Sequence, residues 1–197
     1  GALYGTTTRG GAHGSGTVFQ LTPTEAGYSL TTIWSFSGSA DGALPRDGLT
    51  FNSGGLFGTN SAGGAFSYGT IFEGFPPATP DGDWGGALLW SFTGHADGAF
   101  PSGDLVFDNA GNFYGAARIG GRVSVICRQG CGTIFKGIPP ATPDGPWSGA
   151  LLWSFSGPDG GGPGPLIFDA AGTALYGTTS IHGVARFNPG AVFKLTP

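Results

Sequence analysis

The stretch LYGTTTRGGAHGSGTVFQLTP, residues 3–23, is the best guide to the fold, because a very similar stretch, LYGTTSIHGVARFNPGAVFKLTP, occurs at residues 175–197. Both copies hold two phrases that each occur four times along the chain. Phrases like LYGTT begin at Leu3, Leu56, Phe113 and Leu175. Phrases like GTVF begin at Gly16, Gly69, Gly132 and Gly190. Recurrence in a fixed order indicates a protein built from tandem structural repeats.

Two further phrases complete the repeat unit and give its length. Phrases like IWSFSG begin at Ile33, Leu89 and Leu152, and phrases like GLTF begin at Gly48, Asp104 and Pro165. Trp34 and Trp90 are 56 residues apart, and Trp90 and Trp153 are 63 apart, so one unit is about 60 residues long. We predict a single repeat domain over residues 1–197, with units at approximately 1–47, 48–100, 101–162 and 163–197.

Each unit is predicted to be a small antiparallel β-sheet. Apolar residues alternate, as in Trp34 with Phe36, which is the period of strands rather than of helices. Asp-Gly pairs followed closely by Pro separate the apolar runs and predict turns, which the Asp side chains would cap. These pairs begin at Asp41, Asp97 and Asp159. The sequence therefore predicts four strands in a full unit and no helices.

Such a sheet carries aromatic residues on both faces and hides them only against copies of itself. Radial stacking of four-stranded sheets is the β-propeller arrangement, so we predict an all-β, β-propeller-like fold of about four blades. We take the GLTF, LYGTT, GTVF and WSF runs as strands A, B, C and D of one blade. The chain then reads B-C-D, A-B-C-D, A-B-C-D and A-B-C, which leaves the first and last blades three-stranded.

The repeated aromatic residues form the predicted core. They are Trp34, Trp90, Trp153, Phe36, Phe92, Phe155, Phe19, Phe72, Phe135 and Phe193. A glycine also recurs at one place in strand B, at Gly5, Gly58, Gly115 and Gly177. We expect either close approach of backbones near a propeller axis or common descent to explain it.

Composition narrows the classes of function. Only 10% of residues are charged, and the eight Lys and Arg are dispersed in a chain of net charge -4. The chain therefore lacks the basic footprint of a protein that binds nucleic acid or an anionic membrane. No window of about 18 apolar residues predicts a membrane-spanning helix. Met is absent, so we expect a processed product or a piece of a longer protein.

One family carries these phrases in the same order. The run PSGDLVFDNAGNFYGAA from Pro101, followed by GCGTIF, resembles the GloVer (Gloeo-Verruco) tandem repeat, as do GPLIFDAAGTALYGTT and GAVFKLTP later in the chain. The resemblance covers nearly the whole chain. It implies an exported bacterial repeat protein, extracellular or on the cell surface, and it brings no catalytic residues. Two insertions, PPATPDGDWGGA from Pro76 and PPATPDGPWSGA from Pro139, depart from the family's pattern.

The matching ends bear on assembly. A closed propeller usually completes one blade from both termini, but here the termini duplicate strands B and C. A four-bladed ring, a larger ring of several chains and an open array remain as alternatives. Because unpaired strand edges are templates for association, we predict a structural or interaction protein that assembles with copies of itself into an oligomer or filament. The alternative function is a carbohydrate-binding propeller.

Few residues suggest chemistry. Cys127 and Cys131 predict a local disulfide, with free thiols or a bridge to another chain as alternatives. His13 and His182 share the loop between strands B and C, while Trp84 and Trp147 lie in the Pro-rich insertions. These four are candidate contacts for a ligand or partner; the Trp rings would either stack on a sugar or fold back over their own blade. We predict no catalytic, metal or cofactor site, because no nucleophile motif, phosphate loop or recurring carboxylate pair is present.

Overall fold

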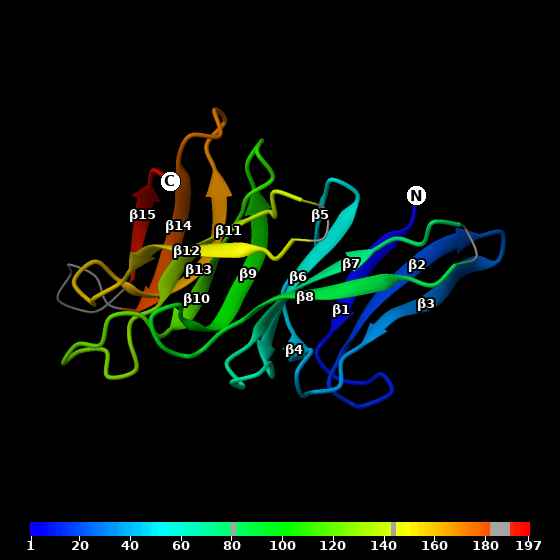
Figure 1. Cartoon of the computed structure of the whole chain (residues 1–197), viewed down its shortest axis with the longest axis horizontal. Coiled ribbons are helices and arrows are strands. Elements are labelled where there is room, and N and C mark those ends of the chain that lie inside the picture. The colour runs from blue at the N-terminus through cyan, green and yellow to red at the C-terminus, as the bar shows by residue number, and fades with distance from the viewer. Residues whose placement is uncertain (80–81, 143–144, 182–189) are drawn as a thin grey trace. The chain divides into compact units, whose positions relative to one another are not determined.

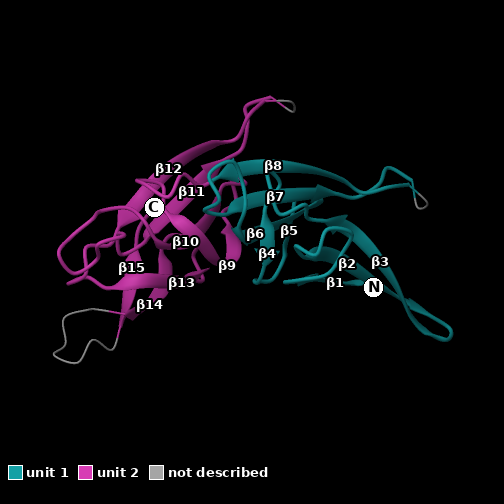
Figure 2. Cartoon of the chain, turned by 90° about the horizontal axis from the view of Figure 1, so that it is seen from below, with its two compact units in different colours: residues 1–91 teal, residues 92–197 magenta. Residues whose placement is uncertain are grey.

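The computed structural model describes residues 1–79, 82–142, 145–181 and 190–197, and every regular element in them is a β-strand. The strands form four antiparallel sheets (Figure 1). The predicted all-β fold class, built from small antiparallel sheets, is thus confirmed. The chain divides into two compact units, Gly1–Ser91 and Phe92–Pro197 (Figure 2).

Unit 1 holds the first two sheets. The first has the order β1(Leu3–Thr7), β2(Thr17–Thr24), β3(Gly27–Ser35). The second has the order β4(Ala43–Pro45), β6(Gly55–Ala62), β7(Thr70–Phe75), β8(Gly85–Ser91), and β5(Thr50–Asn52) also pairs with β6. This second sheet begins at Ala43, ahead of the expected unit start at residue 48. Strand A therefore includes the segment that follows the Asp-Gly turn.

Unit 2 holds the other two sheets. The third sheet consists of β9(Ala99–Phe107), β10(Phe113–Ile119), β11(Thr133–Ile138) and β12(Ser148–Ser154). The fourth consists of β13(Gly161–Phe168), β14(Leu175–Ile181) and β15(Ala191–Leu195). The four sheets follow the predicted strand order. The described residues hold fifteen strands rather than the fourteen predicted, because strand A of the second sheet is divided into β4 and β5. In the third sheet, the equivalent strand β9 is continuous and only shifts its register against β10.

The recurring Asp residues cap turns, as their sequence context predicts. Each carboxylate accepts a hydrogen bond of 2.8–3.0 Å from a backbone N–H a few residues earlier. The donors are Ser37 for Asp41, Thr93 for Asp97 and Ser156 for Asp159. The same turn places a residue in the left-handed region at one position in all three copies: Leu44, Phe100 and Gly162, with φ of 56°, 55° and 58°.

The recurring glycine of strand B has a different cause from the one expected. Gly58 of β6 lies opposite Phe72 of β7, and a Cβ on Gly58 would come within 2.5 Å of the Phe72 ring. The same relation holds for Gly5 with Phe19, Gly115 with Phe135 and Gly177 with Phe193. Glycine therefore makes room for an aromatic ring of the paired strand, not for a converging backbone.

Each unit has its own core. In unit 1 the buried cluster is Val18, Phe36, Leu56 and Phe72. In unit 2 it includes Ile134, Phe155, Leu166 and Leu175, together with both cysteines. Phe92 and Phe135 are buried as well, whereas Phe19, Phe193, Trp34 and Trp90 are only partly buried. One expected core residue, Trp153, is not in the core, because it is 46% exposed. The packing between the sheets, described below, explains this exposure.

Candidate interaction faces

The contact between the sheets of unit 1 shows how one repeat hides the next. Val18, on strand C of the first sheet, is 1% exposed and clusters with Leu56, on strand B of the second. Phe36 follows strand D of the first sheet, and its ring centroid lies 5.0 Å from that of Phe72. We call this arrangement the seam: strand C and the Phe after strand D of one sheet pack on strands B and C of the following sheet.

The indole of Trp34 belongs to the same seam. Its ring stacks on Phe36, with centroids 5.5 Å apart, and it covers Gly86 of β8. A Cβ at Gly86 would lie 1.9 Å from the Trp34 ring, so only glycine fits beneath the indole. Strand D of the second sheet therefore supplies the cover for the Trp of the first.

Unit 2 repeats the seam with different residues. Ile134, on strand C of the third sheet, is fully buried and shares a cluster with Leu175, on strand B of the fourth. Phe155, which follows strand D, packs against Phe193 with centroids 5.2 Å apart. The third and fourth sheets also approach each other through their strands A, where the Ser102 hydroxyl donates a hydrogen bond to the Pro163 carbonyl at 3.1 Å. Two independent seams thus use the same positions of the repeat.

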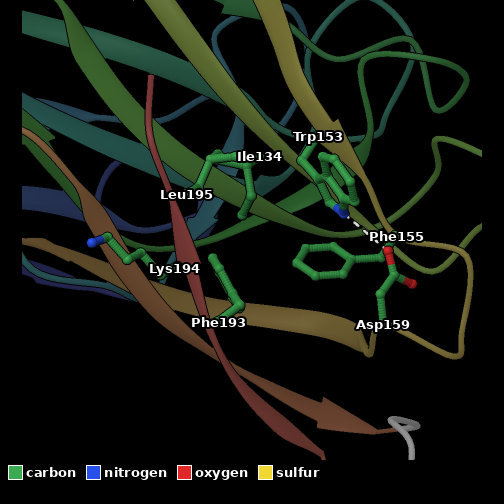
Figure 3. A pocket seen from close by; sticks show the side chains of 7 residues that line it. All are labelled: Ile134, Trp153, Phe155, Asp159, Phe193, Lys194 and Leu195. Carbon is green, nitrogen blue, oxygen red and sulfur yellow. Dashed lines mark hydrogen bonds between the residues drawn. The ribbon is translucent and has the colours of Figure 1, made fainter.

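Trp153 occupies the position of Trp34 but lacks its cover. Among the described residues, β15 pairs only with β14, so the fourth sheet has no strand D to lie over the indole. An open pocket of about 140 Å³ remains beside it, lined by Ile134, Trp153, Phe155, Asp159, Phe193, Lys194 and Leu195. Figure 3 shows Trp153 and Phe155 on one side of this pocket and β15 on the other.

The polar edge of the pocket fixes the indole. Trp153 Nε1 donates to Asp159 Oδ2 at 3.0 Å (Figure 3). Burial raises the pKa of the Asp159 carboxyl, but hydrogen bonds from Ser156 and Trp153 outweigh it and hold the pKa below its ordinary value. The carboxylate is therefore ionised at neutral pH and keeps Trp153 in place although its ring is exposed.

The outer face of the fourth sheet is an exposed half of a seam. Val192 is 79% exposed, whereas its equivalents on strand C of the other three sheets, Val18, Ile71 and Ile134, are at most 1% exposed. Val192, Trp153 and the pocket between them define what we call the C-face.

The first sheet exposes the opposite half. Leu3 on strand B is 57% exposed, whereas its equivalents Leu56, Phe113 and Leu175 are at most 1% exposed. No described strand pairs with the other edge of β1. Leu3 and this edge define the N-face. Since strand C contacts strand B of the following sheet in both seams, the C-face and the N-face are complementary halves of the same contact.

The residues singled out from sequence have varied places. Cys127 and Cys131 form a disulfide within the core of unit 2. His13 is exposed in the loop between β1 and β2, and His182 lies outside the described residues. Trp84 packs back on the core of unit 1, and Trp147 lies 5.0 Å from Phe113 of its own sheet. Among those that the structure describes, Cys127 and Cys131 are bonded to each other.

The sequence predicts open strand edges, but the exposure of Leu3 and Val192 was not foreseen from it. A sequence signal for this exposure exists, because both residues belong to phrases whose other copies are flanked by a further repeat. Within the described segments, no group of three His, Cys, Asp or Glu side chains is placed to hold a metal ion. The same segments contain no helix long and apolar enough to cross a membrane.

Comparisons with known proteins show which family this chain matches. The family model for the Gloeobacter/Verrucomicrobia repeat matches residues 1–144. No curated protein sequence matches the chain. Among solved structures, a putative 6-phosphogluconolactonase from Bacteroides fragilis is 18% identical with a TM-score of 0.49, covering 90% of this chain and 44% of that one. A nidogen/laminin complex is 14% identical with a TM-score of 0.37, covering 100% and 78%. The chain thus spans less than half the length of the first of these structures.

Proposed function

The chain belongs to the Gloeobacter/Verrucomicrobia repeat family, and from that premise we propose that it is a structural repeat protein that binds copies of itself. The C-face of one copy packs on the N-face of the next. This role requires no catalysis.

One observation carries the proposal. Two positions that are at most 1% exposed in every other copy of the repeat are open in the terminal copies, Leu3 at 57% and Val192 at 79%. Fully burying one Leu or Val side chain is favourable by about 1.5–3 kcal/mol. The seams of units 1 and 2 supply the template for the contact, because each joins a strand C to a strand B of the following sheet.

The geometry of the contact determines the kind of assembly. The C-face and the N-face are different surfaces, so the contact is heterologous and continues from copy to copy. It closes into a ring if the rotation per copy allows and otherwise grows into a filament. The edges of β1 and β15 that pair with no described strand add backbone hydrogen-bonding groups beside the two faces.

We propose that this assembly takes place outside the cell or on its surface. The disulfide between Cys127 and Cys131 supports an oxidising compartment. The low charge content of 10% also supports close packing of identical chains, since few like charges would repel.

Sedimentation velocity from about 1 to 200 μM tests self-association. We expect the mean mass to rise with concentration from the 19.8 kDa of one chain. Val192→Lys and Leu3→Lys each place a charge in the buried contact, and each should leave only monomer. Phe66→Lys is the matched control, because Phe66 is 55% exposed but lies in the loop between β6 and β7, on neither the first nor the fourth sheet. A chain that stays monomeric throughout, or a control that dissociates the assembly equally, would contradict the proposal.

A further inference from the structure

A second concave site lies within unit 1, away from both faces. It is an open pocket of about 650 Å³, which falls in the range of small-molecule sites. The floor comes from three strands of the first sheet, with Tyr4 on β1, Gln20 and Thr22 on β2, and Thr31 on β3. The wall comes from the Pro-rich insertion between β7 and β8, namely Pro76, Pro77, Ala78, Thr79, Gly82 and Trp84.

The lining of this pocket is polar but uncharged. Among its described residues there is no Asp, Glu, Lys, Arg or His. Thr22 and Thr31 are exposed, and their hydroxyls make no hydrogen bond within the part of the chain that the structure describes. Gln20 Nε2 donates a hydrogen bond to the Tyr4 hydroxyl at 3.1 Å. This bond orients the amide of Gln20 and leaves its carbonyl oxygen on the side away from Tyr4. The described lining therefore offers hydrogen-bond donors and acceptors and no charged side chain.

Two aromatic rings form a corner of the pocket. The rings of Tyr4 and Trp84 have centroids 5.8 Å apart and an interplanar angle of 64°. Trp84 is held in this position because it packs on the core of unit 1. A rigid aromatic face next to neutral hydrogen-bonding groups suits a ligand with an apolar face and polar edges.

We propose that this pocket binds a neutral saccharide. The C–H face of a pyranose ring would lie against Trp84, and its hydroxyls would meet Thr22, Thr31 and the Gln20 amide. A charged ligand is disfavoured, because no side chain in the described lining would neutralise it. This inference is independent of self-association, since none of the lining residues belongs to the C-face or the N-face.

The third sheet shows that the site is not a general property of the repeat. Tyr114, the equivalent of Tyr4, donates its hydroxyl to Asp108 Oδ2 at 2.8 Å, and Lys136 Nζ lies 5.3 Å from the centre of its ring. The equivalent of Trp84 is Trp147, whose ring lies at 30° to that of Phe113. In the third sheet, the positions of Tyr4 and Gln20 are thus part of a charged network. In the second sheet, which comes before the insertion that holds Trp147, these positions are Phe57 and Glu73. Trp147 therefore serves as the matched control.

The test titrates soluble hexasaccharides of neutral glucans, chitin, mannan, xylan and galactan into the Val192→Lys chain by calorimetry. This variant keeps the two proposals separate, because its surface change lies outside the pocket. We expect at least one hexasaccharide to bind with Kd below about 10 mM. We also expect heparin hexasaccharide, which is charged, not to bind.

Trp84→Ala should weaken that binding at least tenfold, and Trp147→Ala should leave it unchanged. Thr31→Val keeps the shape and removes one hydroxyl, so it tests the pocket without disturbing the core; we expect a loss of about threefold to tenfold. No binding by any neutral probe, binding of heparin alone, or equal losses for Trp84→Ala and Trp147→Ala would overturn the proposal.

Discussion

Trp34 and Trp153 stand in the same phrase of the repeat but in different surroundings. The indole of Trp34 covers Gly86 of the following sheet and stacks on Phe36. The indole of Trp153 is 46% exposed beside an open pocket, because the fourth sheet has no described strand D. The comparison shows that a repeat of this kind specifies half of a contact and that the next repeat supplies the other half.

The two Trp positions should differ most in their contribution to stability. Trp34→Ala removes a ring packed on Phe36, Phe72 and Gly86, and we expect it to lower the free energy of unfolding by about 3 kcal/mol. Trp153→Ala should cost less than about 1 kcal/mol in the monomer, since Trp153 is 46% exposed. Urea unfolding at low protein concentration measures both. Equal losses would mean that the covering strand adds nothing.

The two Val positions on strand C sharpen the comparison with identical substitutions. Val18→Ala removes two methyl groups from a side chain that is 1% exposed, and we expect a loss of about 2 kcal/mol. Val192→Ala removes the same atoms from a side chain that is 79% exposed, so stability should change by no more than about 0.5 kcal/mol. Urea midpoints of the two variants give the difference directly. A large loss for Val192→Ala would show that its face is already covered in the single chain.

The loops between strands B and C also differ between the units. In unit 1 they close on backbone bridges, Gly10 with Ser15 and Gly63 with Tyr68. In unit 2 the longer loop carries the disulfide, whose sulfurs lie in the core. The double variant Cys127→Ser with Cys131→Ser should lose up to about 2 kcal/mol, the value expected for closing so short a loop. Thermal unfolding with and without reductant checks this: reductant should lower the Tm of the native chain and not that of the double variant.

The smallest expected effect is an opposite response of the units to acid. Burial raises the pKa of Glu73 in unit 1 above 4.5, so unit 1 gains stability as pH falls through that raised value and Glu73 becomes protonated. In unit 2, hydrogen bonds outweigh burial and hold the pKa of Asp159 below 3.8, so its contribution is lost as pH falls through the lowered value.

Urea midpoints between pH 7 and pH 3 separate these two groups. Glu73→Gln should remove the gain on acidification, and Asp159→Asn should remove the loss below about pH 4. Variants that follow the pH profile of the native chain would show that neither carboxyl group titrates differently on folding.

Much of the fold could be predicted from the sequence because the phrases recur. Four copies of one strand pair and three Asp-Gly turns give the strand order, and alternation of apolar residues gives the strands. The sequence predicts Trp153 in the core because equal phrases are expected to have equal surroundings, and this holds only where another sheet follows. The role of Gly58 depends on a ring across the strand pair, a contact that no local pattern reports.

The candidate sites were less accessible to sequence reasoning. Leu3 and Val192 differ from their equivalents only in what lies beyond their sheet, and this is a property of the assembled fold. The sequence allows Trp84 either to stack on a sugar or to fold back over its own blade. The structure shows that its ring both packs on the core and lines a pocket with Tyr4, so the two alternatives are not exclusive.

The central claim, that the last sheet of one copy packs on the first sheet of another, can be tested by cross-linking between copies. One preparation carries Leu3→Cys, a second carries Val192→Cys, and a third carries Phe66→Cys, in the loop between β6 and β7, as a control. Under mild oxidation we predict disulfide-linked dimers when the first and second preparations are mixed, and few when either is oxidised alone or with the third. Equal cross-linking in all combinations, or none in the first mixture, would contradict the account.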